Sequence, residues 1–341
     1  MSISLVGIDL AKEVFHIHGV DKLGREVVKK RVYRSDLLDF VSRLPASRVV
    51  IEACGGSNYW AREFEKFGHR VQLVAPQYVK PFVKRNKNDW KDAEAICTAA
   101  RQSNMRYVPK RTQQQQDIQN LHRIRQRLVK SRTALINEAR GFLYEYGIVI
   151  AKGRRTFAKT YPEMMLNHGE RLSGLARTTL YELWQEYLSL DKRINAYEAK
   201  LKRIAKETPV CELLMGVPGI GFLTATGLFA AVGDINVFKN GREMAAWLGL
   251  TPREHSTGGK QRLYGISKRG DTYLRTLLIH GARTTLRYLK NHNDRRSVWA
   301  TNLLERKGTN RTAVALANKN ARVAWAMMAN HQSYIEFPLA A

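Results

Sequence analysis

A regular apolar repeat in the middle of the chain constrains its fold more than any other feature. The repeat alternates intervals of three and four residues without a break, at Leu180, Leu183, Tyr187, Leu190, Ile194, Tyr197, Leu201 and Ile204. This spacing forms one stripe along an α-helix, and such a stripe needs a facing helix. A weaker stripe with intervals of seven precedes it, at Leu121, Leu128, Leu135 and Phe142. We therefore predict two long helices, over 113–146 and 178–207, connected by residues 147–174.

The facing helix of the second stripe can come from two sources. A stripe this regular favours a coiled coil between chains, so we expect a homo-oligomer, a dimer or a tetramer, held through these helices. The alternative is a helical hairpin or bundle within one chain.

The first hundred residues have a different pattern, in which strand and helix signals alternate. Short apolar runs predict strands over 4–9, 14–21, 25–34, 48–53 and 70–76, and helical stretches are expected over 35–44, 58–67 and 89–102. Three strands, a helix and then alternating strands and helices predict a sheet covered by helices. We expect an α/β domain over 1–110, a coiled-coil region over 111–207, and a mainly helical domain over 208–341.

The charge of the chain points to a class of partner. Lys and Arg number 57 against 30 Asp and Glu, which gives a net charge of +27. An excess of this size favours a polyanion, and nucleic acid is the commonest. Since no apolar run reaches the length of a membrane span and no signal-peptide pattern opens the chain, we expect a cytoplasmic protein without membrane contact. The three scattered cysteines fit neither a disulfide framework nor a zinc site.

Against this positive charge, four acidic residues occupy positions where α/β folds keep functional groups. Asp9 and Glu52 each end an apolar run, and Asp89 and Asp92 lie three apart at the start of a predicted helix. In a βββαβα order the first and fourth strands are parallel neighbours, so their carboxyl ends meet at one sheet edge. Residues three apart share a helix face. We expect all four acids to meet at that edge.

Four carboxylates in one place cannot all be ionised without cations, and hard oxygen ligands suit Mg²⁺ or Mn²⁺. Two such ions would stabilise the attacking and leaving oxygens of a phosphoryl transfer. Each acid also has a structural interpretation. An Asp after a strand is often a turn former, and Asp89 is a candidate helix cap with Asp92 as the acid three residues on. The set of four in this strand order favours the metal site.

The last third of the chain opens with a glycine-rich turn and continues as a basic loop. The segment "GVPGIG" (216–221) is typical of a helix-hairpin-helix turn, where Gly219 and Gly221 let backbone N–H groups approach a phosphate. The alternative is a tight turn between two packed helices. The loop over 248–270 offers candidate phosphate ligands at Arg253, Lys260, Arg262, Lys268 and Arg269.

Several segments carry a resemblance to a known family. "GIDLAK" (7–12), "IEACGG" (51–56) and "KNDWKDAEAI" (87–96) are similar to the Asp-Glu-Asp-Asp signature of insertion-sequence transposases of the IS-one-ten family. The N-terminal domain of that family resembles RuvC, the Holliday-junction resolvase of the RNase H-like fold. "GVPGIG" and "GLTPREHSTGGKQRLYGISKRGDTYLRTLL" resemble its C-terminal transposase domain, and "HSTGGK" is similar to its IS-eleven-eleven subgroup. The resemblance covers nearly the whole chain and maps the signature onto Asp9, Glu52, Asp89 and Asp92.

The resemblance also implies a serine that attacks the DNA backbone and forms a covalent phosphoserine link. The candidates are Ser256 and Thr257, because part of the family reads Ser-Gly where this chain reads Thr257-Gly258. We favour Ser256, whose primary hydroxyl is less hindered. A serine hydroxyl needs a base, a metal or a charge-stabilising surround, and His255 is adjacent, although adjacent side chains often point apart. The alternative is a flexible basic loop that only binds DNA.

The family function implied for the chain is that of a DNA recombinase or transposase guided by RNA. A structured RNA from the element would pair with target and donor DNA, while the acids and the serine would form a composite site. Two other interpretations stay open. One is a structure-specific nuclease, similar to a junction resolvase, that uses only the acids. The other is a non-catalytic scaffold that binds nucleic acid.

Overall fold

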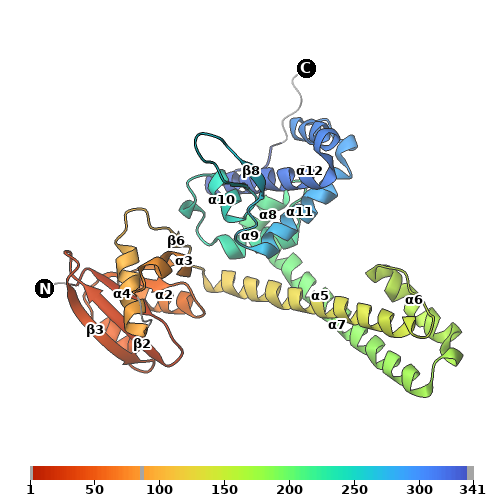
Figure 1. The fold of residues 1–341 in the computed structure, drawn as a ribbon, viewed down its shortest axis with the longest axis horizontal. Coiled ribbons are helices and arrows are strands. Elements are labelled where there is room, and N and C mark those ends of the chain that lie inside the picture. The colour runs from red at the N-terminus through yellow and green to blue at the C-terminus, as the bar shows by residue number, and fades with distance from the viewer. Residues whose placement is uncertain (1–2, 85–87, 336–341) are drawn as a thin grey trace. The chain divides into compact units, whose positions relative to one another are not determined.

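The computed structural model describes residues 3–84 and 88–335 (Figure 1). Residues 85–87, which belong to the basic stretch ahead of Asp89, lie outside the described residues. The chain divides into two compact units. The first comprises residues 1–114 with 232–239, and the second comprises residues 115–231 with 240–341. The sequence analysis expected three regions, 1–110, 111–207 and 208–341, and their separate functions remain a prediction.

The first unit is built on one mixed sheet with the strand order β3-β2-β1-β4-β5-β6. The strands are β1 (Leu5–Asp9), β2 (Val14–Val20), β3 (Glu26–Tyr33), β4 (Arg48–Glu52), β5 (Arg70–Val74) and β6 (Tyr107–Val108). β1 is antiparallel to β2 and parallel to β4, so the first and fourth strands are neighbours as predicted. The short strand β6 pairs antiparallel with β5 and was not predicted, since two residues carry no alternation.

Helices cover both faces of this sheet. They are α1 (Leu37–Ser42), α2 (Ser57–Glu65), α3 (Pro76–Val79) and α4 (Asp89–Ala100), with the 3₁₀ turn η1 (Lys80–Phe82). Val49 and Ile51 pack in the same cluster as Trp60 of α2, whereas Val50 packs with Ile96 of α4. β4 is therefore buried on both faces, which explains its continuous apolar run. The predicted α/β class is confirmed for this unit.

Two long helices and a shorter one form a helical arm in the second unit: α5 (Gln113–Tyr144), α6 (Arg154–Asn167) and α7 (Gly174–Glu207), with η2 (Gly169–Arg171) (Figure 1). Leu180, Tyr187 and Ile194 of the apolar stripe are buried in one cluster with Leu128 and Leu135 of α5. The same chain thus provides a facing helix, which is the alternative of a hairpin within one chain and not the favoured pairing between chains. The oligomeric state remains a prediction.

Helix α6 was missed and lies inside the expected connection over 147–174. Its buried side chains, Phe157, Tyr161 and Met164, follow a helical spacing that the Lys- and Arg-rich composition obscured. Tyr161 stacks on Trp184 of α7 with ring centroids 5.1 Å apart, and its hydroxyl donates to the carbonyl oxygen of Leu180 at 2.8 Å. The apolar stripe therefore packs against α6 as well as α5.

The rest of the second unit is mainly helical, as predicted. It contains α8 (Pro209–Met215), α9 (Phe222–Val232), α10 (Gly241–Trp247), α11 (Thr272–Leu286), α12 (Arg295–Asn330), η4 (Leu289–Asn291) and the hairpin of β7 (Pro252–Glu254) and β8 (Leu263–Ile266). The turn η3 (Ile235–Val237) belongs to the first unit. None of the described helices combines the length and the hydropathy needed to cross a bilayer.

The segment "GVPGIG" forms the turn between α8 and α9, a position that both the helix-hairpin-helix turn and the tight turn between packed helices share. Gly219 has a φ of 93°, and a Cβ there would lie 3.0 Å from the carbonyl oxygen of Gly281 in α11. Helix packing therefore requires glycine at this position. Gly221 is exposed, and phosphate binding by this turn remains a prediction.

Candidate active site

The acidic pair at the start of α4 is held in place by a neighbouring residue. Asn88 is the N-cap, and its side-chain oxygen accepts from the backbone N–H of Lys91 at 2.9 Å. The interpretation of Asp89 as the cap is therefore wrong. Asp89 is the first helical residue, and Asp92 follows one turn later, so their acidic charge lies at the positive end of the helix dipole. The N-cap residue is therefore Asn88, one residue before the acidic pair begins.

α4 lies unusually close to β1 because of Gly7. A Cβ at Gly7 would lie 2.7 Å from the carbonyl oxygen of Ala93 and 2.8 Å from Sγ of Cys97. The Cys97 thiol donates to the carbonyl oxygen of His18 at 3.1 Å, and burial raises its pKa to about 12. Only a glycine on this strand allows the helix to approach so closely.

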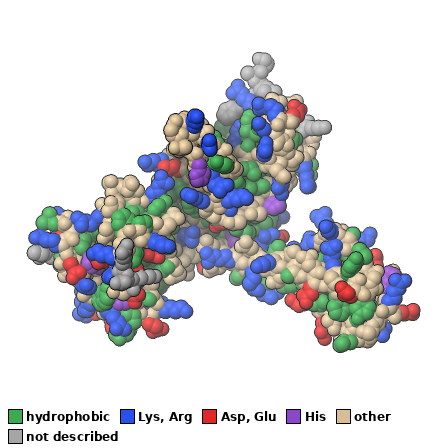
Figure 2. All heavy atoms as spheres, viewed as in Figure 1, with side chains coloured by type: hydrophobic (Ala, Val, Ile, Leu, Met, Phe, Trp, Pro, Cys, Tyr) green, Lys and Arg blue, Asp and Glu red, His purple; other side chains and the backbone are tan. Residues whose placement is uncertain are grey.

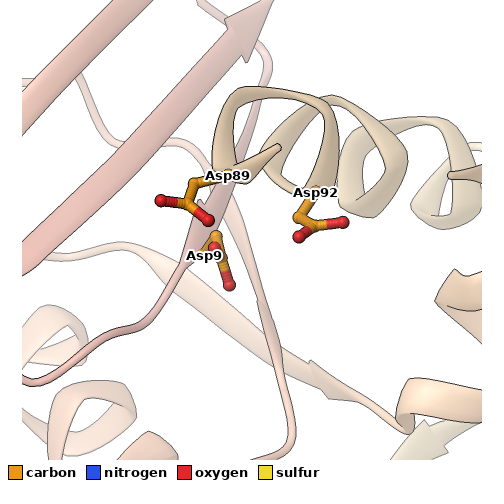
Figure 3. Close-up of side chains that lie close together, drawn as sticks. All are labelled: Asp9, Asp89 and Asp92. Carbon is orange, nitrogen blue, oxygen red and sulfur yellow. The ribbon is translucent and has the colours of Figure 1, made fainter. Parts of the chain in front are cut away.

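This approach brings three of the four predicted acids together. Asp9 at the end of β1 joins Asp89 and Asp92, each offering a carboxylate oxygen that lies within 4.8 Å of the other two. Figure 3 shows the three side chains gathered below the first turn of α4. Asp89 is exposed, and the other two are half-buried. Hard oxygen ligands in an accessible position fit Mg²⁺ or Mn²⁺.

Glu52 lies next to this group, on the neighbouring strand. The register pairs Ile8 of β1 with Ile51 of β4, so Asp9 and Glu52 end adjacent parallel strands. Glu52 is not among the three described acids whose oxygens lie within 4.8 Å of one another. Burial raises the pKa of the Cys54 thiol, and the charges of Glu52 and Asp9 raise it further, so both carboxylates act on the same loop.

One residue beside the acids was missed by the sequence reasoning. His16 on β2 pairs with Asp9 in the sheet register, and its Nδ1 lies 3.8 Å from Oδ2 of Asp89. Its ring packs edge-on against Trp90, with centroids 4.7 Å apart. The alternation of His16 and His18 along one strand was the signal, since it places both rings on one face.

The predicted serine lies on a two-stranded hairpin formed by β7 and β8. The backbone groups of Thr257 and Lys260 hydrogen-bond to each other across the turn, and Gly258 and Gly259 between them have φ of 55° and 73°. A two-residue turn with both φ values positive is the type that matches the twist of a hairpin. Thr257 is therefore part of the turn itself, while Ser256 precedes it.

The Ser256 hydroxyl is held by two neighbours. Its Oγ donates to Oε1 of Glu254 at 2.5 Å and accepts from the backbone N–H of Arg262 at 3.3 Å. The ring of His255 packs instead against the ring of Tyr264, at 5.7 Å between centroids. Glu254 was not identified from the sequence. The signal was a carboxylate two residues before the candidate serine.

The predicted phosphate ligands of the loop are all exposed, at Arg253, Lys260, Arg262, Lys268 and Arg269. Lys268 has a φ of 54° and its N–H donates to the carbonyl oxygen of Gly249, which fixes the end of the hairpin. Figure 2 shows Lys and Arg side chains over both units, with fewer acidic ones between them. The hairpin thus combines a hydroxyl, a carboxylate and several cations on an accessible surface.

Comparison with known proteins decides the family. A model of the "Transposase IS116/IS110/IS902 family" matches residues 211–297, and a model of IS110 DEDD transposases, described as "Transposase", matches residues 6–148. The chain is 47% identical over 97% of its length to the transposase for insertion sequence element IS1111A of Coxiella burnetii, covering 91% of that protein. This chain belongs to the IS116/IS110/IS902 family of transposases. The resemblance inferred from its motifs is confirmed.

Two further relatives of this IS110-family transposase span almost the same length. A probable family 20 transposase of Pseudomonas aeruginosa is 47% identical over 98% of the chain and 99% of that protein. The transposase for insertion sequence element IS1328 of Yersinia enterocolitica is 40% identical over 95% and 96% respectively. Transposases cut and rejoin DNA, so the chain is an enzyme of DNA strand transfer.

Each of the two family matches contains one of the candidate sites, the acids or the serine hairpin. The match over 6–148 contains the four acids, and the match over 211–297 contains the glycine-rich turn and the serine hairpin. A DEDD transposase domain uses divalent metal ions, and the oxygen ligands of Asp9, Asp89 and Asp92 fit that use. Helix α7 lies wholly between the two matches.

Proposed function

We propose that this transposase is an RNA-guided DNA recombinase that cuts and rejoins strands through the Ser256 hydroxyl, assisted by Mg²⁺ or Mn²⁺. The observation that carries the proposal is the meeting of Asp9, Asp89 and Asp92, whose oxygens lie within 4.8 Å of one another. Like charges held this close repel one another, and a bound divalent cation would offset that repulsion.

The acids would hold the cation at the open edge of the sheet. Asp9, Asp89 and Asp92 supply the closest oxygens, and Glu52 on the adjacent strand supplies a fourth carboxylate. A divalent ion bound there stabilises negative charge on phosphoryl oxygens. His16, 3.8 Å from Asp89, helps to fix the orientation of that carboxylate.

The hairpin would supply the nucleophile. Ser256 is preferred over Thr257 because its hydroxyl already has a carboxylate partner, whereas Thr257 is engaged in the turn. The exposed cations Arg253, Lys260 and Arg262, with Lys268 and Arg269, would hold the DNA backbone. Such contacts position a strand without reading its sequence, so the choice of target falls to base pairing with a guide RNA from the element.

We further propose target and donor DNA as substrates and a dimer or tetramer as the active form. The net charge of +27 supports contact with RNA and two DNA duplexes at once. In this proposal residues 1–110 form the catalytic acid domain, residues 111–207 the coiled-coil region and residues 208–341 the transposase domain with the serine.

A second candidate function uses the acids alone. A metal-dependent, junction-resolvase-like nuclease would need only the cluster of Asp9, Asp89 and Asp92. Such an enzyme cleaves DNA through water and leaves no protein–DNA bond. A non-catalytic scaffold, in turn, would bind nucleic acid without change on loss of any of these acids.

The experiment that separates them is capture of a covalent adduct. The purified protein, with and without the RNA that copurifies with it, is mixed with strand-matched DNA and Mg²⁺, and then denatured. We expect a DNA-linked protein band with wild type and RNA, and none with Ser256→Ala or Asp9→Asn. Cleavage without an adduct would favour the nuclease. Recombination that survives both substitutions would refute the proposal.

A further inference from the structure

We infer that Glu254 is the proton acceptor for Ser256, taking the hydroxyl proton when Oγ attacks the DNA phosphate and returning it when Oγ departs. The inference rests on the proposed function, since it assumes that Ser256 is the nucleophile. It assigns a catalytic role to a residue outside the Asp-Glu-Asp-Asp set.

The geometry of the contact supports this assignment. Oγ of Ser256 and Oε1 of Glu254 are 2.5 Å apart. This distance is typical of an O–H group donating to an ionised carboxylate, where bonds of about 2.5–2.7 Å are found. An ionised carboxylate only accepts, so the serine must be the donor. The proton therefore already points toward the oxygen that would receive it.

The second contact of the hydroxyl leaves it able to attack. A hydroxyl has one proton and two lone pairs. The proton of Ser256 goes to Glu254, and one lone pair accepts from the N–H of Arg262 at 3.3 Å. The remaining lone pair is available to a phosphorus atom. Gln261 donates through Nε2 to the same Glu254 oxygen at 3.4 Å, which helps to hold the carboxylate beside the serine.

The fold of the hairpin selects Glu254 over its neighbours. Glu254 is the last residue of β7, and the Ser256 hydroxyl two residues later lies against its carboxylate. The N–H of His255 donates to the carbonyl oxygen of Arg262 at 3.0 Å, which fixes the register of the two strands. The ring of His255 packs on Tyr264, whereas the Ser256 hydroxyl is hydrogen-bonded to Glu254.

The chemistry balances without a further reactant. In the first step the Oγ–phosphorus bond forms, the bond from phosphorus to a deoxyribose oxygen breaks, and the Oγ proton passes to Glu254. The departing oxygen takes a proton from water. In the second step a deoxyribose hydroxyl attacks the phosphoserine and the Oγ–phosphorus bond breaks. The attacking hydroxyl gives its proton to the hydroxide left by the first step, and Oγ recovers its proton from Glu254. Carboxylates accept a hydroxyl proton in the same way in kinases.

The test compares rates of adduct formation at saturating RNA and DNA. Glu254→Gln keeps an oxygen that accepts from Ser256 but removes the base, and general base catalysis contributes about 10²–10⁴-fold. We expect a loss of at least about 100-fold in the rate, with affinity for DNA and RNA unchanged. Glu254→Asp, which keeps a carboxylate, should be at least about 10-fold faster than Glu254→Gln. His255→Gln is the matched control and should stay near the wild-type rate.

The outcomes separate this inference from the proposed function. If wild type forms the adduct at Ser256 and Glu254→Gln forms it equally fast, Glu254 is not the base although the serine is the nucleophile. An equal loss in Glu254→Asp and Glu254→Gln, or a matching loss of DNA affinity, assigns the contact to hairpin shape and overturns the inference. An adduct that persists in Ser256→Ala refutes the proposed function as well.

Discussion

Gly7 of β1 lies directly against Ala93 of α4, so that a Cβ at Gly7 would come within 2.7 Å of the Ala93 carbonyl oxygen. This contact sets how close the helix lies to the sheet. It therefore also sets the separation between Asp9, two residues along the strand, and the acids of the first helical turn.

Replacing that glycine tests the dependence of the site on helix packing. Gly7→Ala must push α4 away from the strand, and overpacking of this kind costs about 1–3 kcal/mol. We expect urea denaturation to show that loss, and titration with Mn²⁺ to show weaker binding. Gly55→Ala, where a Cβ would meet nothing within 4 Å, is the control and should change neither. Unaltered Mn²⁺ binding in Gly7→Ala would show that metal binding by the acids does not depend on how closely α4 packs on β1.

The cap of α4 gives a second prediction. Asn88→Ala removes the side-chain acceptor of the Lys91 N–H, and loss of such a cap costs about 1 kcal/mol. Asp89→Ala should leave the stability nearly unchanged, because Asp89 does not cap. Chemical denaturation of both variants without metal measures the difference. A larger cost for Asp89→Ala than for Asn88→Ala would restore Asp89 as the cap.

Metal binding should stabilise the first unit through the acid group. A ligand at 100 times its dissociation constant raises the free energy of unfolding by about 2.7 kcal/mol. We expect Mn²⁺ to raise the melting temperature of wild type, and Asp89→Asn to lose most of that rise. Asp36→Asn removes an exposed acid outside the group, and this variant should show the same rise in melting temperature with Mn²⁺ as wild type. Equal stabilisation of all three proteins would place the metal elsewhere.

The arm can be tested through its apolar stripe. Leu180 is fully buried, and Leu180→Ala should cost about 2–5 kcal/mol. Leu188 on the same helix is 42% exposed, so Leu188→Ala should cost much less. Because the stripe packs within one chain, light scattering should give the same oligomeric state for Leu180→Ala as for wild type. Dissociation in that variant would show that the stripe joins two chains.

His122 predicts how the stability of the second unit depends on pH. Burial lowers its pKa to about 4, and its two ring nitrogens contact the hydroxyls of Tyr273 and Thr226 at 2.9 and 3.0 Å. The unfolded chain, with a histidine pKa of 6.5, binds the proton first, so stability is complete above pH 6.5 and is lost as the pH falls toward 4. The free energy of unfolding falls by about 3 kcal/mol over this pH range.

Urea denaturation between pH 7 and pH 4 measures this effect. The difference in unfolding free energy between wild type and His122→Asn should shrink by about that amount across the range. Leu188→Ala, which changes an exposed side chain that does not titrate, should show a constant difference. A pH-independent difference for His122→Asn would mean that the ring binds its proton equally well in the folded and the unfolded chain.

The pairing of the first and fourth strands and the approach of Asp9 to Asp89 and Asp92 followed from sequence, because both rest on short, strong patterns. Apolar runs that end in Asp9 and Glu52 identify parallel strands with a common carboxyl edge. The cap was assigned one residue too late, since Asn88 and Asp89 are both good caps and only the backbone distinguishes them. For the same reason, boundaries such as those of α4 are less predictable than the element itself.

Other features depend on contacts that no local pattern contains. Tertiary packing decides which helix faces the apolar stripe. The sequence pattern of the stripe is the same whether α5 or a helix of a second chain packs against it. The pairing of Glu254 with Ser256 needs the hairpin register, which the two glycines at the turn determine. Gly7 gave no signal in the sequence, because its role exists only against α4.

Helix α7 also sets a length scale. Its 34 residues, at about 1.5 Å each, make a rod of about 50 Å. A duplex lying alongside it would be matched over about 15 base pairs at about 3.4 Å per pair. Because aromatic stacking and ion pairs such as Arg125 with Glu198 brace this rod against its neighbours, that span is a fixed dimension of the molecule. The length of the helix would therefore set the distance between nucleic-acid contacts placed at its two ends.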